Sequence, residues 1–122
     1  MGKNIGTRSI EELGDSIRQF AQLREWEQFH SPKNLCMALS VECAELMEHF
    51  QWLTEAQSRR LPSATKTEAA TEIADVFIYL IRLSQVLEID LLASVQEKLA
   101  VNAEKYPIEK ARGSAQKYTK FK

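Results

Sequence analysis

Hydrophobic residues recur every three or four positions along most of this chain, the spacing that places them on one face of an α-helix. The pattern predicts four helices, at about residues 10–29, 32–52, 65–87 and 91–106. Ser9, Ser31 and Asp90 stand where N-terminal caps are expected, and Pro107 stops the last helix. No segment alternates as a strand would. The sequence therefore predicts an all-α protein, an antiparallel four-helix bundle with short connections.

The size and charge of the chain narrow the classes of function. Its 122 residues, 44% of them hydrophobic, suffice for one core, so we expect residues 1–122 to form a single all-α domain. Sixteen basic and 17 acidic residues give a net charge of −1, which argues against a nucleic acid polymer or a membrane as partner. No apolar run is long enough to cross a bilayer, and residues 1–6 hold no hydrophobic signal core. A cytoplasmic location is expected.

The segments between and beyond the predicted helices differ from them. Residues 54–64 include Pro62 and lack a sustained apolar stripe, so they are expected to form a connection with room for one helical turn. Residues 108–122 carry one acid and five bases without periodicity, which predicts a basic, irregular tail. Cys36 and Cys43 are separated by a rise of roughly 10 Å on one helix, too far for a disulfide. We expect both to be small buried thiols in a reducing compartment.

Two helices carry acids where apolar residues are expected. Glu42 lies on a stripe of leucines, and Glu45 follows three positions later. The next long helix repeats this spacing with Glu72 and Asp75. Residues three positions apart share one helical face, with about 5–6 Å between their Cβ atoms. If the two helices are antiparallel neighbours, four carboxylates converge, and their mutual repulsion calls for a neutralising cation.

A hard divalent cation fits such a cluster. Mg²⁺ binds carboxylate and water oxygens and leaves room for phosphate oxygens. A single acid in a chain with 27% charged residues is most often a solvated side chain, but two pairs inside apolar helices favour metal binding. A di-iron bundle would need a Glu-x-x-His string on each of two helices, and this chain has one such string, Glu27-x-x-His30. Iron is therefore disfavoured.

The acids also stand in a familiar context. Glu42-x-x-Glu45, a gap and then Glu72-x-x-Asp75 resemble the acidic signature of the all-α nucleoside triphosphate pyrophosphohydrolases of the MazG-like superfamily. Five further strings resemble the dCTP pyrophosphatase branch of that superfamily, and the similarity covers about residues 17–119. They are REWEQFHSPKNL (residues 24–35), FQW (50–52), DVFIYL (75–80), EKYP (104–107) and KYT (117–119).

This resemblance implies an enzyme that hydrolyses a nucleoside triphosphate to the monophosphate and pyrophosphate with Mg²⁺, for which Mn²⁺ can substitute. The implied substrate is dCTP or a modified dCTP, and the implied role is housecleaning of the nucleotide pool. Relatives often have glycines where this chain has Val41 and Ala44, and an aspartate where it has Ala100. The connection between the acidic helices is also shorter. These departures leave the chemistry intact and the choice of substrate open.

The resemblance further assigns roles to the acids. Glu42, Glu45, Glu72 and Asp75 are the implied metal ligands and catalytic carboxylates. One of them, or the nearby Glu48, is expected to orient the attacking water as a general base. Glu48 fits equally well as a solvated acid at the rim of the site.

Contacts to phosphate are expected from the last helix. Lys98 and Asn102 lie four positions apart, with Lys105 three further on, so that all three share one face. They match the Lys-x-x-x-Asn-x-x-basic-Tyr-Pro string of the family. Arg82 is a weaker candidate. The alternative for each base is an ordinary solvated position on the surface.

Contacts to the nucleoside are expected from aromatic residues. By resemblance, Trp26, His30 and Trp52 would stack on the base, and Tyr79, four positions beyond Asp75, would flank the sugar. The first two lie four positions apart and would face the same way on a continuous helix. In a helical protein of another kind, Trp26 would simply belong to the core.

Two other classes of function stay open, a non-catalytic nucleotide sensor on the same helical scaffold and a helical dimerisation or metal-storage module. The four acids argue against the first, and the aromatic cluster argues against the second. A single thin bundle offers few walls around a nucleotide, so a homodimer or a dimer of dimers is expected. Its interface is predicted to include Phe77, Ile81, Leu91 and Val95.

Overall fold

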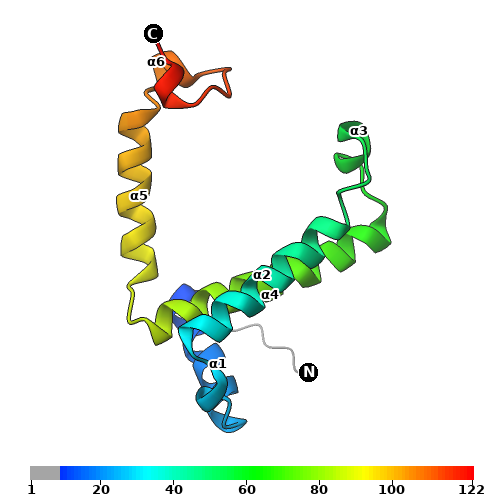
Figure 1. The fold of residues 1–122 in the computed structure, drawn as a ribbon, viewed down its shortest axis with the longest axis vertical. Helices are drawn as coiled ribbons and strands as arrows, with labels where there is room; N and C mark the ends of the chain where they lie inside the picture. The colour runs from blue at the N-terminus through cyan, green and yellow to red at the C-terminus, as the bar shows by residue number, and fades with distance from the viewer. Residues whose placement is uncertain (1–8) are drawn as a thin grey trace. The chain divides into compact units, whose positions relative to one another are not determined.

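The computed structural model describes residues 9–122, in which all regular structure is helical (Figure 1). The predicted all-α class is therefore confirmed, and no helix within this range has the length and apolarity to cross a membrane. Residues 1–8, with the stretch expected to lack a signal core, lie outside the described residues. The α-helices are α1 (Ile10–Leu23), α2 (Pro32–Glu48), α3 (Glu55–Ser58), α4 (Ser63–Val86), α5 (Leu91–Lys105) and α6 (Ile108–Ala111), with 3-10 turns at Glu27–Phe29 and Tyr118–Lys120.

The chain divides into two compact units, Met1–Glu88 and Ile89–Lys122. The first unit holds α1 to α4, and the second holds α5 and α6. The expectations of a single domain and of a four-helix bundle stay predictions, because both depend on how α5 packs against the first unit.

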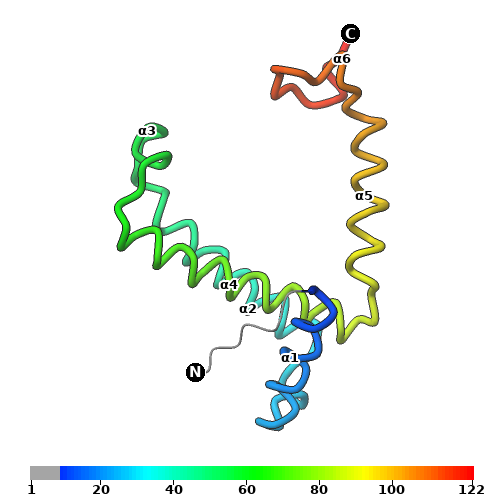
Figure 2. The backbone as a smooth tube through the Cα atoms, turned by 180° about the vertical axis from the view of Figure 1, so that it is seen from behind, coloured from blue at the N-terminus to red at the C-terminus, as the bar shows by residue number. Residues whose placement is uncertain are grey.

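In the first unit, α2 and α4 lie side by side, and the short α3 joins them at one end (Figures 1 and 2). The two helices therefore run antiparallel, as the convergence of the acid pairs requires. Helix α1 also packs against α4. The buried apolar side chains come from these three long helices and are Ile17, Ala21, Leu35, Ala69 and Ile81.

Helix α1 ends at Leu23, well before the predicted end. Glu25 adopts a left-handed backbone conformation, with φ at 54°, which an α-helix cannot continue through. The Trp26 amide donates to the Ala21 carbonyl (2.9 Å) and the Glu25 amide donates to the Gln22 carbonyl (3.0 Å). These two bonds form a Schellman C-cap. Its left-handed position is normally glycine, so a glutamate there concealed the stop in the sequence.

Helix α2 starts at its predicted cap. Ser31 Oγ accepts a hydrogen bond from the Asn34 amide (3.1 Å), and Pro32 occupies the first turn of α2. Helix α2 ends at Glu48, four residues before the predicted end. The one short helix expected between the acidic helices is α3, where Thr54 provides the N-cap.

Both cysteines are exposed free thiols, so the expectation that they are buried is wrong. The neighbouring Leu35 takes the buried position on α2, with 2% of its surface exposed, and turns Cys36 outwards. The expected absence of a disulfide between Cys36 and Cys43 is confirmed.

The buried face of α4 also differs from the apolar stripe that the sequence predicts for this helix, which consists of Ala69, Ile73, Val76, Leu80, Leu83 and Leu87. Ile73 and Leu80 of that stripe are 54% and 40% exposed, whereas Ile81 and Arg82 are buried. The packed face is thus rotated by about one position. Ile81 is covered within its own chain and is not available for the predicted dimer interface.

The second unit consists of α5 and a folded tail. Asp90 caps α5 by accepting a hydrogen bond from the Ala93 amide (3.0 Å), and the helix ends just before Tyr106, as predicted. The segment predicted to be irregular contains α6 and a 3-10 turn. The Tyr106 ring packs edge-on against the rings of Tyr118 and Phe121, with centroids 5.8 and 5.7 Å apart. These contacts fix the tail to α5.

Candidate functional site

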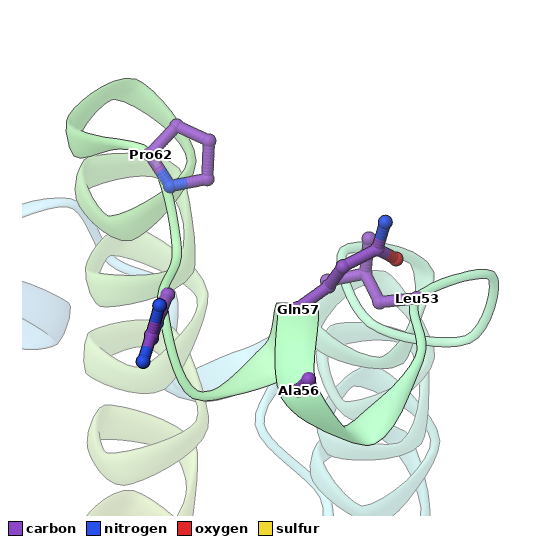
Figure 3. A pocket seen from close by; sticks show the side chains of 5 residues that line it. Leu53, Ala56, Gln57 and Pro62 are labelled. Carbon is purple, nitrogen blue, oxygen red and sulfur yellow. The ribbon is translucent and has the colours of Figure 1, made fainter.

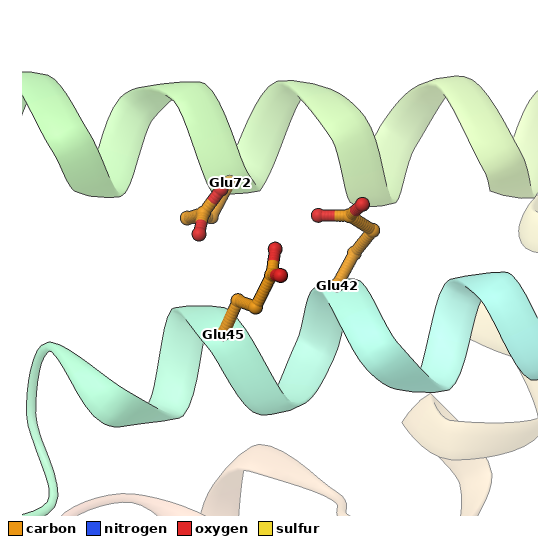
Figure 4. Close-up of side chains that lie close together, drawn as sticks. All are labelled: Glu42, Glu45 and Glu72. Atoms are coloured by element: carbon orange, nitrogen blue, oxygen red, sulfur yellow. The ribbon is translucent and has the colours of Figure 1, made fainter.

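Three carboxylates converge between α2 and α4 (Figure 4). Glu42 and Glu45 project from α2, and Glu72 projects towards them from α4. One carboxylate oxygen from each lies within 4.8 Å of the other two. Two features bring the carboxylates together. The acids of each pair lie three positions apart and share one helical face, and the two helices run antiparallel side by side. The structure therefore brings together three of the four acids expected to bind metal.

Glu42 is the most perturbed member of this cluster. Its Oε2 atom is fully buried and has no hydrogen-bond partner among the described residues. Burial and the neighbouring acids Glu45, Asp75 and Glu72 together raise the pKa of Glu42 from its ordinary value of 4.5 to about 7, and burial is the largest cause. A buried oxygen without a donor, surrounded by other carboxylates, is the arrangement that a bound cation satisfies.

Asp75, the fourth predicted acid, lies beside the cluster and not within it. Its charge contributes to the raised pKa of Glu42, and both side chains line a cavity of about 290 Å³. This volume is at the lower end of the roughly 300–1,000 Å³ found for ligand pockets. The carboxylate cluster and the cavity therefore share Glu42.

The cavity has apolar walls and a few polar groups, as small-molecule sites do. Its polar residues besides the two acids are His30, Tyr79 and Arg82. The apolar walls come from α1, α4 and the segment after α1, and consist of Ile17, Phe20, Ala21, Trp26 and Ile78. Three predicted substrate contacts, Trp26, His30 and Tyr79, are thus brought to one place.

Trp26 and His30 reach the cavity by a route different from the predicted one. They do not share a continuous helix, because α1 has already ended and a 3-10 turn lies between them. Their rings nevertheless pack edge-on, with centroids 6.4 Å apart. Trp26 packs in the same way against Phe20 (5.7 Å). The Schellman cap therefore redirects the chain so that an aromatic wall forms at the end of α1.

His30 is also held by α4. Arg82, which is only 6% exposed, donates from Nε to His30 Nδ1 (2.9 Å) and from a terminal nitrogen to Gln85 Oε1 (2.9 Å). Gln85 Nε2 in turn donates to the Gly14 carbonyl on α1 (2.8 Å). Burial lowers the pKa of His30, and the positive charge of Arg82 lowers it further against the opposing effect of Glu27. Arg82 was a weaker phosphate candidate in the sequence, and the structure shows it buried in this hydrogen-bonded chain.

His49 is a neighbour of the cluster that the sequence analysis did not assign to the site. Its Nε2 lies 3.8 Å from Glu72 Oε2, and both side chains are largely buried. The signal was its position four residues after Glu45, at the end of α2. A protonated His49 would form an ion pair with Glu72.

Two predicted residues of the first unit, Trp52 and Glu48, neither line the cavity nor belong to the carboxylate cluster. Trp52 follows α2 and is 86% exposed, and Glu48 is exposed at the end of α2. Lys98, Asn102 and Lys105 lie on α5 in the second unit, where Lys105 Nζ sits 4.9 Å from the centroid of the Tyr118 ring. Their parts in the site stay predictions.

A second cavity, of about 410 Å³, lies where α3 joins α2 and α4 (Figure 3). It is lined by Leu53, Ala56, Gln57, Arg60 and Pro62. None of the predicted site residues reaches it, and it holds no acid. The cavity-lining acids of the candidate site, Glu42 and Asp75, therefore belong to the first cavity.

Comparison with known proteins identifies the family of this chain. The profile of the MazG-like family matches residues 37–121, which include both acid pairs. The chain belongs to the MazG-like family. It is also similar to dCTP pyrophosphatase 1 of Rattus norvegicus, with 41% identity over 113 residues (91% of this chain and 66% of that protein). The Homo sapiens protein of the same name is 39% identical over 115 residues, covering 93% of this chain and 68% of that protein.

The fold agrees with that assignment. A crystal structure of a pyrophosphatase from Archaeoglobus fulgidus matches with a TM-score of 0.71 and 40% identity, covering 87% of this chain and 99% of that one. The chain spans about two thirds of the length of the curated mammalian relatives that it matches. The family and the resemblance inferred from the sequence motifs are therefore confirmed.

Proposed function

We propose that this protein is a nucleoside triphosphate pyrophosphohydrolase that forms the monophosphate and pyrophosphate. The observation that carries the proposal is Glu42, whose buried, unpaired oxygen belongs both to a carboxylate cluster and to a cavity with an aromatic wall. A triphosphate is anionic and a nucleobase is flat, so one ligand fits both halves of this site. The names of the similar proteins, dCTP pyrophosphatase and pyrophosphatase, support the same reaction.

We propose Mg²⁺ as the metal, with Mn²⁺ as a substitute, held by Glu42, Glu45, Glu72 and Asp75. The donor set fits, since all four groups are carboxylates and hard divalent cations prefer oxygen. When bound, Mg²⁺ supplies neutralising charge and Lewis-acid polarisation of the phosphates.

The side chains of the protein supply binding, orientation and proton transfer. Glu48, or one of the cluster acids, would accept the proton of the attacking water. Trp26 and Trp52 would stack on the base, and stacking contributes about 1–3 kcal/mol per base. His30 would contact the base, and Tyr79, on the cavity wall, would flank the sugar.

The triphosphate needs positive groups where metal does not reach it. We propose that Lys98, Asn102 and Lys105 supply them from one face of α5. The expected substrate is dCTP or a modified dCTP, whose removal would clean the nucleotide pool.

We also propose that the protein self-associates as a homodimer or a dimer of dimers. Large apolar side chains stay uncovered in the single chain, including Phe77 (38% exposed) on α4 and Val95 (47%) on α5. Covering them is favourable, and two-fold pairing is the commonest closed solution. Light scattering should show at least twice the mass of one chain. A fully active monomer would contradict this proposal.

A panel of ribo- and deoxynucleoside triphosphates, with Mg²⁺ or with a chelator, tests the function. We expect pyrophosphate as the first product, highest turnover with dCTP or its base-modified forms, and no turnover after chelation. Orthophosphate as the first product would point to a different reaction. Nucleotide binding without any turnover would make the protein a sensor instead of an enzyme.

A further inference from the structure

We propose that Arg82 is a positioning residue that holds His30 as a neutral hydrogen-bond donor aimed at an acceptor on the nucleobase. The inference rests on the proposed function, which supplies a nucleotide as the ligand. Its geometry comes from a chain of hydrogen bonds in the first unit. That chain runs from the Gly14 carbonyl through Gln85 and Arg82 to His30.

The direction of each bond follows from the chemistry of its groups. A guanidinium has only donors, so His30 Nδ1 must be the acceptor of the 2.9 Å bond from Arg82 Nε. In a neutral imidazole with a bare Nδ1, the proton resides on Nε2. His30 Nε2–H has no acceptor among the described residues, and the half-buried ring lines the cavity. The ring therefore offers the cavity a donor.

Gln85 determines the placement of Arg82. The Gly14 carbonyl can only accept, so it fixes the Gln85 amide with Nε2 towards α1 and Oε1 towards the guanidinium. Gln85 packs directly over Gly14, since a Cβ atom built there would stand 3.4 Å from Gln85 Nε2, at the near limit of ordinary van der Waals contact. Helices α1 and α4 thus support one imidazole.

Arg82 itself is unsuited to direct phosphate binding. It is 6% exposed, and two of its nitrogens are already engaged by neutral partners. It also lies two turns beyond Asp75 on α4, a rise of roughly 10 Å along the helix from that acid. A metal-bound triphosphate at the acids would place its base towards the aromatic wall, where Trp26 packs against His30. Arg82 therefore acts on the base through His30.

Nuclear magnetic resonance of the imidazole nitrogens shows which of them carries a proton, and it needs neither substrate nor metal. The chain has two histidines, so His49 serves as an internal reference. Arg82 contacts His30 from α4, the charge of Glu27 acts on it from the preceding 3-10 turn, and Glu42 and Asp75 line the shared cavity.

We compare the wild type with Arg82→Met, Gln85→Leu and the neighbouring control Ser84→Ala, checking each fold by circular dichroism. In the wild type and in Ser84→Ala, His30 should keep a bare Nδ1 and a protonated Nε2 as the pH falls from about 7.5 to 6. In Arg82→Met the ring should take up a second proton in this range, and Gln85→Leu should behave between the two. Identical His30 signals in the wild type, Arg82→Met and Gln85→Leu would overturn the proposal.

Kinetics then separate positioning from phosphate binding. Arg82→Met should raise the KM for the nucleotide about tenfold, and Gln85→Leu by about threefold, with kcat within about twofold, as expected for a weakened base contact. A fall in kcat at unchanged KM would assign Arg82 to the reacting phosphates and refute the proposal. If the wild type releases no pyrophosphate, the proposed function fails, while the imidazole spectra still decide whether Arg82 fixes His30.

Discussion

At the scale of single residues, the unusual feature is a carboxylate in a packed position. Glu42 interrupts the leucine stripe of α2, and its buried Oε2 has no donor among the described residues. Its pKa, raised to about 7 by burial and by the neighbouring acids, shows that the free protein tolerates this charge poorly. The ionised Glu42 carboxylate thus lowers the stability of the metal-free protein at the place where the proposed function needs negative charge.

This cost predicts how stability depends on pH without metal. The pKa of Glu42 is higher in the folded chain (about 7) than its ordinary value of 4.5, so the folded state binds more protons between these values. The contribution of Glu42 to stability is therefore complete below about pH 4.5 and is lost as the pH rises through about 7. Glu42→Gln removes the ionisable group and should flatten this part of the curve.

Thermal unfolding with chelator at several pH values measures the effect. At about pH 8, Glu42→Gln should be more stable than the wild type by about 1 kcal/mol, or roughly 3–5 °C in Tm, since partial exposure screens the charge. The difference should vanish near pH 4.5. Parallel curves of stability against pH for the two proteins would show that ionisation of Glu42 does not destabilise the fold.

At the scale of elements, the sequence predicted the helices well where a cap and an apolar stripe coincide. Ser9, Ser31 and Asp90 all cap helices in the structure. The end of α1 was missed because Glu25 holds a left-handed position that usually signals itself as glycine. Propensity cannot reveal such a stop when the hydrogen bonds of the cap, and not the residue type, impose it.

The part of the candidate site that depends on spacing within a helix could be predicted, and the part that depends on contacts between distant segments could not. The acid pairs follow from a spacing of three on each helix, and the structure brings three of these acids within 4.8 Å of one another. The bond between Arg82 and His30 joins residues 52 positions apart and depends on the burial of Arg82. The sequence offers Arg82 as a weaker phosphate contact, with a solvated position on the surface as the alternative. A rotation of one position in the packed face was enough to hide this contact from the sequence.

At the scale of the whole molecule, the carboxylate cluster and the cavity lie within the first unit. The cluster, the cavity and the His30 support all belong to Met1–Glu88, whereas the expected phosphate contacts lie in Ile89–Lys122. The match to the MazG-like family extends over both units, from residue 37 to residue 121. The central claim is therefore that the carboxylates of the first unit perform the chemistry of this family.

Pyrophosphate release by carboxylate variants tests that claim most directly. We compare the wild type, Glu45→Gln, Asp75→Asn and the control Glu68→Gln, an exposed acid one turn before Glu72 on α4. With dCTP and Mg²⁺, Glu45→Gln and Asp75→Asn should each lower turnover by at least about 100-fold. Both should keep the wild-type Tm or exceed it, because each loses a repelling charge. Glu68→Gln should match the wild type. Wild-type turnover in Glu45→Gln or Asp75→Asn would contradict the assignment of these carboxylates to the reaction.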